Sequence, residues 1–162
     1  MLSFDIECQG RKGYFPEAEK DPVIQIANCV SVYGTADPVV KNVFTLKGCL
    51  PIVGTQVIPS ETEHDLLLKW VAFLRAVDCD IITGYNVQNF DIPYLLDRAE
   101  ALQKARNGPN LTPFKVRELA TELFRELTLR NKRMDRDCLS ILAYTLLYLR
   151  FVYHSLRSSG AG

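Results

Sequence analysis

The sequence predicts an α/β fold in which three strands joined by short turns lead into alternating strand and helix segments. Three observations support this prediction. Apolar and polar residues alternate over residues 2–9, the next two apolar segments are rich in β-branched residues, and from about residue 60 the apolar spacing becomes that of a helix. The 162 residues correspond to one domain of ordinary size.

Three strands are expected at residues 2–9, 23–32 and 39–46. In the first, the apolar residues of one face are Leu2, Phe4, Ile6 and Cys8. A glycine-rich turn follows this strand, and Gly34 with Asp37-Pro38 separates the second strand from the third. Such short connections predict an antiparallel meander.

Glycine and proline then mark residues 47–59 as a loop, after which Ser60 or Thr62 can cap a helix. The apolar stripe of this helix is Leu66, Leu67, Trp70, Val71, Phe73, Leu74 and Val77. A short apolar strand is expected within residues 80–86. A second helix is expected to open near Pro93 and to run through Leu102.

Beyond Asn107-Gly108-Pro109, two further helical patterns are expected, at residues 112–133 and 138–156. The second pattern is apolar enough to be weighed as a membrane span. Polar and charged residues such as Arg150 and His154 interrupt it, so a core or partner helix is favoured and no membrane contact is expected.

Lysine plus arginine and aspartate plus glutamate both number 19, so no global positive field marks the chain as a non-specific nucleic-acid binder. Any contact with DNA must be local. The five cysteines form no CxxC pair, which predicts buried thiols in a reducing compartment. The N-terminal residues lack the layout of a signal peptide, which favours the cytosol or the nucleus.

Two acidic residues, Asp5 and Glu7, share one face of the first predicted strand, although such residues are disfavoured in strands. Their Cβ atoms are about 7 Å apart, close enough to ligate neighbouring divalent metals. The alternative is the solvated face of an edge strand.

A second acidic position, Asp91, follows Asn86, Asn89 and Phe90 between a predicted strand and a predicted helix. Catalytic residues often occupy such junctions, although an aspartate there can also be a simple helix cap. The combination of this position with Asp5 and Glu7 favours a site. Because clustered carboxylates repel each other, at least one of them is expected to have a raised pKa without metal.

The two acidic segments have the forms D-x-E and N-x-x-x-F-D, in that order along the chain. Both resemble the first and second motifs of the 3′→5′ proofreading exonuclease domain of replicative B-family DNA polymerases. The resemblance runs from Leu2 to about Lys104. Residues 1–104 are therefore expected to be the N-terminal part of such a domain, and residues 105–162 a divergent helical tail.

The resemblance implies a ribonuclease-H-like mixed sheet with flanking helices, and phosphodiester hydrolysis at DNA 3′ ends that uses two Mg²⁺ or Mn²⁺ ions. By motif position, Asp5 would bridge both ions, Glu7 would hold the ion on the side of the attacking water, and Asp91 would help to hold the second ion. Asn86 and Phe90 would position the single-stranded or frayed 3′ end. The implied partners are DNA, the rest of a polymerase and its accessory subunits, in the nucleus.

The family also has a third motif, Y-x-x-x-D on a late helix, which residues 105–162 lack. The only such string, Tyr33 to Asp37, lies in a predicted turn and is interpreted as coincidence, and Asp135 and Asp137 are interpreted as surface charges. The domain is thus expected to be truncated at its C-terminal side, with impaired activity.

Two alternatives to an active DNA exonuclease remain. One is a non-catalytic remnant that keeps the fold and binds metal or single-stranded DNA weakly. The other is an RNA exonuclease of the same fold, which the polymerase-like residues 10–23 disfavour.

Overall fold

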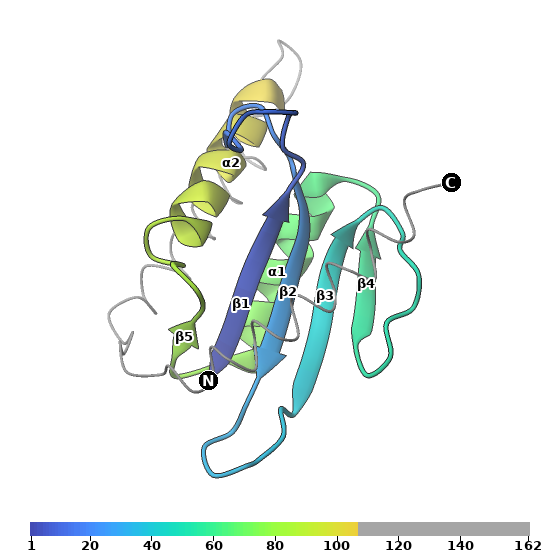
Figure 1. Ribbon diagram of the computed structural model, residues 1–162, viewed down its shortest axis with the longest axis vertical. Helices are drawn as coiled ribbons and strands as arrows, with labels where there is room; N and C mark the ends of the chain where they lie inside the picture. Colours follow the sequence, from blue (N-terminus) through green and yellow to red (C-terminus); the bar gives the residue numbers. More distant parts are fainter. Residues whose placement is uncertain (107–162) are drawn as a thin grey trace.

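The computed structural model describes residues 1–106 (Figure 1). Their elements, in chain order, are β1 (Leu2–Cys8), β2 (Val23–Val30), β3 (Val40–Leu46), β4 (Gln56–Ser60), α1 (Glu63–Val77), β5 (Ile82–Thr83) and α2 (Asp91–Arg106). The predicted helices at 112–133 and 138–156 lie outside the described residues, as do Asp135 and Asp137. Neither described helix is long and apolar enough to cross a membrane.

The five strands form one mixed sheet in the order β4-β3-β2-β1-β5. β1 pairs with β2, and β2 with β3, in antiparallel fashion, which confirms the predicted meander. β5 runs parallel to β1 and β4 runs parallel to β3. The prediction of a mixed sheet with strand-helix units after three antiparallel strands is therefore confirmed.

The first three strands end or begin one or two residues inside their predicted bounds, and three further elements differ from the sequence prediction. The predicted loop at 47–59 contains most of β4, a strand of five residues that is too short to show its period and forms by pairing with β3. The short strand predicted within residues 80–86 consists of the two residues of β5. Helix α2 begins at Asp91, two residues before Pro93.

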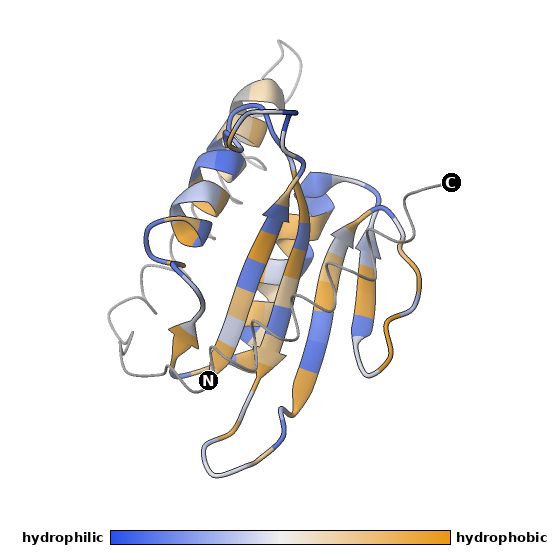
Figure 2. Cartoon of the chain, in the orientation of Figure 1, coloured by the Kyte–Doolittle hydropathy of each residue, from blue (hydrophilic) through white to orange (hydrophobic). Residues whose placement is uncertain are grey.

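The main core lies between one face of the sheet and the two helices (Figure 1). Figure 2 shows the alternation of hydrophobic and hydrophilic residues along β1 that makes this face apolar. Phe4 packs on Trp70 of α1 with ring centroids 5.1 Å apart, and Leu95 of α2 belongs to the same buried cluster. Of the two predicted caps of α1, the structure uses Thr62, whose hydroxyl accepts a hydrogen bond from the Asp65 amide.

Two linked, buried hydrogen bonds between side chains cross this core. Trp70 Nε1 donates to Asn28 Oδ1 at 2.9 Å, and Asn28 Nδ2 donates to Asn42 Oδ1 at 3.0 Å. Buried amides are costly unless their hydrogen bonds are made, so Trp70 both fills the core and satisfies the asparagine of β2. The indole N–H therefore links α1 to β2 inside the core.

Replacing Trp70 by Phe is expected to lower the free energy of unfolding by about 2–4 kcal/mol, because it shrinks a packed side chain and leaves Asn28 Oδ1 without its donor. Urea unfolding followed by far-UV circular dichroism measures this. Leu68→Ala is the control on the same helix, since Leu68 is 41% exposed, and should cost less than about 1 kcal/mol. Equal losses in the two variants would contradict the assigned role of Trp70.

Candidate active site

The site begins on the sheet face opposite the helices. Since Leu2, Phe4 and Ile6 of β1 point into the core, the strand period places Asp5 and Glu7 on the other face, and both are partly buried. Asp5 lies opposite Ala27 and Glu7 lies opposite Gln25 of β2.

Asp91, the first residue of α2, reaches back to β1. Asp91 is only 1% exposed, and its Oδ1 accepts a hydrogen bond of 3.1 Å from the backbone N–H of Ile6. Within residues 1–106, β5 pairs only with Leu2 and Ser3 of β1, and the Leu2 amide donates to the carbonyl oxygen of Ile81 at 2.8 Å. Amides two residues apart point to the same edge of a strand, so the amides of Leu2 and Ile6 face the same side of β1. β5 has ended before it reaches Ile6, and Asp91 supplies the acceptor there instead.

The connection from β5 to α2 carries Asp91 to that position. A Cβ atom on Gly84 would lie 2.4 Å from the carbonyl oxygen of Phe4, so only glycine allows the chain to pass β1 this closely. Asn86 then adopts a left-handed conformation with φ of 56°, and its carbonyl accepts hydrogen bonds from the amides of Asn89 and Phe90. This tight turn ends at the first residue of α2.

Three carboxyl groups of this region have raised pKa values. Burial is the largest cause for Asp91, followed by the charge of Asp5, and together they raise the pKa of Asp91 to about 7. Burial also raises the pKa of Asp5, while a hydrogen bond from Asp91 acts in the opposite direction. The pKa of Glu7 is raised by burial and then by the charge of Asp5. The shifts agree with the sequence prediction, although desolvation outweighs repulsion as their cause.

Of the two neighbouring carboxyl groups, Asp91 has the larger shift of pKa. Its second oxygen, Oδ2, is buried and has no hydrogen-bond partner among residues 1–106. A buried carboxylate oxygen with no donor, beside a second carboxylate, fits a divalent cation, because Mg²⁺ and Mn²⁺ take oxygen ligands and would cancel the repulsion.

The structure thus brings Asp5 and Asp91 together, and Glu7 stands two residues further along the same strand. Within residues 1–106, no three His, Cys, Asp or Glu side chains are grouped closely enough to hold a metal ion. Of the three predicted carboxylates, Asp5 and Asp91 are therefore the two that lie together within residues 1–106.

The two predicted substrate residues lie near this pair. The exposed Asn86 accepts a hydrogen bond of 2.9 Å on Oδ1 from Asn89, so its side chain is held in the turn. Phe90 packs between Phe15, at 5.4 Å between ring centroids, and Tyr94, at 5.5 Å.

Sequence reasoning missed Phe15, which is 74% exposed and lies in the loop between β1 and β2. The sequence pattern predicts only a turn there, because the contact of Phe15 with Phe90 joins residues far apart in the sequence. Glu63 and Arg98 were missed for the same reason. They form a nearly buried ion pair of 2.7 Å between α1 and α2.

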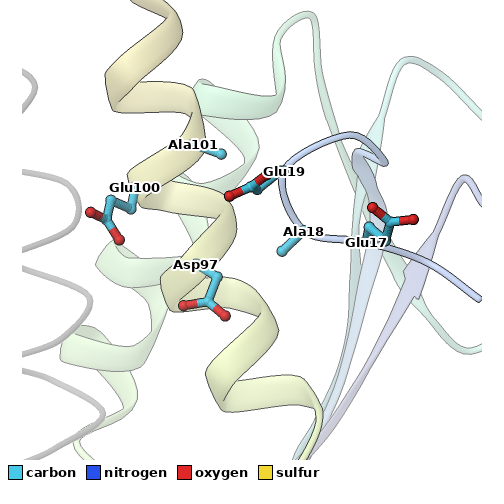
Figure 3. A pocket seen from close by; sticks show the side chains of 6 residues that line it. All are labelled: Glu17, Ala18, Glu19, Asp97, Glu100 and Ala101. Carbon is cyan, nitrogen blue, oxygen red and sulfur yellow. The ribbon is translucent and has the colours of Figure 1, made fainter.

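The hollow shown in Figure 3 lies elsewhere, between the loop and α2. Its lining residues are Glu17, Ala18, Glu19, Asp97, Glu100 and Ala101. No predicted site residue lines it, and its walls are acidic. It is therefore a poor fit for a polyanionic nucleic acid.

Comparison with known proteins adds an independent finding. The family model described as "DNA polymerase family B, exonuclease domain" matches residues 1–141, which extends the likeness beyond the limit near Lys104 that the motifs indicated.

The DNA polymerase delta catalytic subunit of Dictyostelium discoideum is 62% identical over 103 residues, which are 64% of this chain and 9% of that protein. The DNA polymerase delta catalytic subunit of Drosophila melanogaster is 53% identical over 136 residues, 84% of this chain and 12% of that protein. This chain therefore spans about a tenth of the length of these relatives. A solved structure of the family B DNA polymerase from the archaeon Pyrobaculum calidifontis is 33% identical, covering 62% of this chain and 11% of its own, with a TM-score of 0.44.

The raised pKa of Asp91 predicts a pH dependence of stability. The folded chain binds the Asp91 proton more tightly than the unfolded chain, so the bound proton adds to the free energy of unfolding. This stabilisation is complete below the ordinary pKa of 3.8 and is lost as the pH rises to about 7. Asp91→Asn keeps an acceptor for Ile6 and removes the titration. When the pH is raised from 5 to 8 without metal, the free energy of unfolding of the wild type should fall by on the order of 2 kcal/mol relative to that of this variant.

Urea unfolding at both pH values in EDTA measures this difference. Titrating groups remote from Asp91 are common to the two chains and cancel in the comparison, whereas any change in the pKa of Asp5 belongs to the pair and is part of the measured difference. A stability difference that does not change with pH would show that Asp91 is not a buried titrating group.

Proposed function

We infer the function of this chain from its family: the chain belongs to the exonuclease domain family of family B DNA polymerases. The proposed function is that of a segment of the 3′→5′ proofreading exonuclease domain of a replicative polymerase of the delta type. The observation that supports it most is the pairing of the partly buried Asp5 with the buried Asp91. Asp91 accepts a hydrogen bond from the Ile6 amide, which joins the two motif segments.

In the proposed site, Asp5 and Asp91 hold divalent cations with their carboxylate oxygens, and Glu7 adds a ligand from the next outward position of β1. Two bound Mg²⁺ or Mn²⁺ ions would supply an activated water and stabilise the leaving 3′ oxygen. The chain itself contributes orientation. The Ile6 amide fixes one oxygen of Asp91, and the other oxygen remains available beside Asp5.

The substrate is the 3′ end of single-stranded or frayed DNA. Asn86 contributes hydrogen bonding and Phe90 contributes an apolar surface at the terminal nucleotide. The equal numbers of acidic and basic residues are consistent with a local contact, with most of the DNA held by the rest of a polymerase and its accessory subunits. The nucleus is the corresponding location.

A second candidate is a non-catalytic remnant that keeps the fold and binds metal or single-stranded DNA weakly. Two observations favour it. The third motif is absent from the sequence, and residues 1–106 contain no group of three ligands arranged around one ion. Metal binding and cleavage therefore have to be measured separately.

Metal binding is expected to be weak, with millimolar Mn²⁺ raising the melting temperature by about 2–5 °C, because few ligands are in place. A thermal melt with and without Mn²⁺ measures this. Asp5→Ala should abolish the shift. Asp37→Ala, which removes a carboxylate from the exposed β2–β3 loop, should retain it. Identical shifts in all three chains would place the bound ion elsewhere.

Cleavage of a 3′-labelled DNA strand with Mg²⁺ is expected to be roughly 10²-fold or more slower than in a complete site, because the groups of the third motif that orient water are missing. The residual cleavage should disappear in Asp5→Ala and persist in Asp37→Ala. Rapid Asp5-dependent degradation would contradict the expected impairment. If such rapid degradation were lost in the double variant Asp135→Ala, Asp137→Ala, the missing ligand would be assigned to residues beyond 106. Cleavage of a matched RNA strand tests the preference for deoxyribose over ribose.

A further inference from the structure

One face of α2 makes hydrogen bonds at three successive levels. Asp91, Tyr94 and Arg98 are spaced by three and four residues, so they share this face. Asp91 accepts from the Ile6 amide of β1, the Tyr94 hydroxyl donates to the carbonyl oxygen of Asp21 at 2.8 Å, and Arg98 Nη1 donates to the carbonyl oxygen of Ala18 at 3.0 Å. Two of these levels therefore tie the helix to the loop that follows β1.

The third level also includes a forked ion pair with α1. Arg98 donates from Nε and Nη2 to the two oxygens of Glu63, at 2.8 and 2.7 Å, and their side chains are only 11% and 8% exposed. Glu63 Oε1 further accepts a hydrogen bond of 2.7 Å from the amide of Val23. The planar guanidinium group of Arg98 makes both hydrogen bonds to the Glu63 carboxylate in one geometry, which a lysine ammonium cannot reproduce. Helix α2 is thereby connected to the starts of α1 and β2.

The loop that receives Tyr94 and Arg98 is itself held in place. Asp21, whose side chain is 3% exposed, accepts hydrogen bonds from Arg11 Nε at 3.0 Å and from the Glu17 amide at 2.8 Å. The loop that carries the two acceptor carbonyls is therefore held by hydrogen bonds within itself. In contrast, the apolar contacts of Leu95 and Ala99 are non-directional and tolerate a small rotation or slide of the helix.

We propose that Tyr94 and Arg98 are positioning residues, which set the rotation and height of α2 so that Asp91 stays bonded to Ile6 with its second oxygen beside Asp5. The catalytic consequence rests on the proposed exonuclease function. Neither residue touches the proposed reacting atoms. A displacement of about 1 Å at such a site commonly lowers the rate about 10²-fold.

The test uses the full chain with the variants Arg98→Lys and Tyr94→Phe, and Asp97→Asn as an exposed control on the same helix. The first readout is hydrogen exchange of the Ile6 amide, which reports its bond to Asp91 without any need for catalysis. The Val39 amide, which donates to Val30 at 2.8 Å far from α2, reports general loosening of the fold. The second readout is kcat and KM for a single-stranded DNA substrate with Mn²⁺.

In Arg98→Lys, the Ile6 amide should exchange about 10-fold faster while Val39 is unchanged. The kcat should fall about 10-fold with KM within about 2-fold, because only orientation in the transition state is lost. Tyr94→Phe should change both readouts in the same direction by less, and Asp97→Asn should change neither.

Unchanged exchange at Ile6 in both variants would overturn the proposal, as would equal acceleration at Ile6 and Val39, which indicates general destabilisation alone. If Ile6 alone is accelerated but the wild type shows no Asp5-dependent cleavage, the positioning of Asp91 is supported and the proposed exonuclease function fails. Should Arg98→Lys not fold, Tyr94→Phe gives the same comparison with one hydrogen bond removed.

Discussion

The hydrogen bond from the Ile6 amide to Asp91 Oδ1 is the contact on which the candidate site depends. It joins two segments 85 residues apart and replaces a strand partner with a side chain at the edge of β1. A buried backbone N–H without an acceptor would cost about 1–3 kcal/mol, so the fold itself requires an acceptor here. Because that acceptor is a carboxylate, the same contact places a second acidic oxygen beside Asp5.

This arrangement carries an electrostatic cost. Burial and mutual repulsion both disfavour the state in which the two carboxyl groups are charged, and the pKa of Asp91 is raised as a result. A proton relieves this cost at low pH, and a divalent cation would relieve it at neutral pH. The rest of the molecule opposes separation of the pair: Gly84 lets the chain approach β1, and Arg98 with Glu63 holds α2 from the other end.

Much of the architecture was predictable from local pattern. The period of two in residues 2–9 and the β-branched segments after it predicted the antiparallel meander. The helical stripe, with Ser60 or Thr62 as its cap, predicted α1. β4 and the short β5 were less predictable, because strands of five and two residues depend on neighbours rather than on their own period. The likeness to one family of exonuclease domains also extends further along the chain than its two motifs indicated.

The sequence by itself determined which residues are available for chemistry, since the spacing of Asp5 and Glu7 on a strand and the place of Asp91 before a helix are local properties. Only the tertiary structure decided which of them meet. Asp5 and Asp91 are brought together because β5 ends early and α2 supplies the next acceptor to β1, whereas Glu7 lies a strand period away from that contact. The ion pair of Glu63 with Arg98 had no local signal, because a contact between distant segments exists only when the chain has folded.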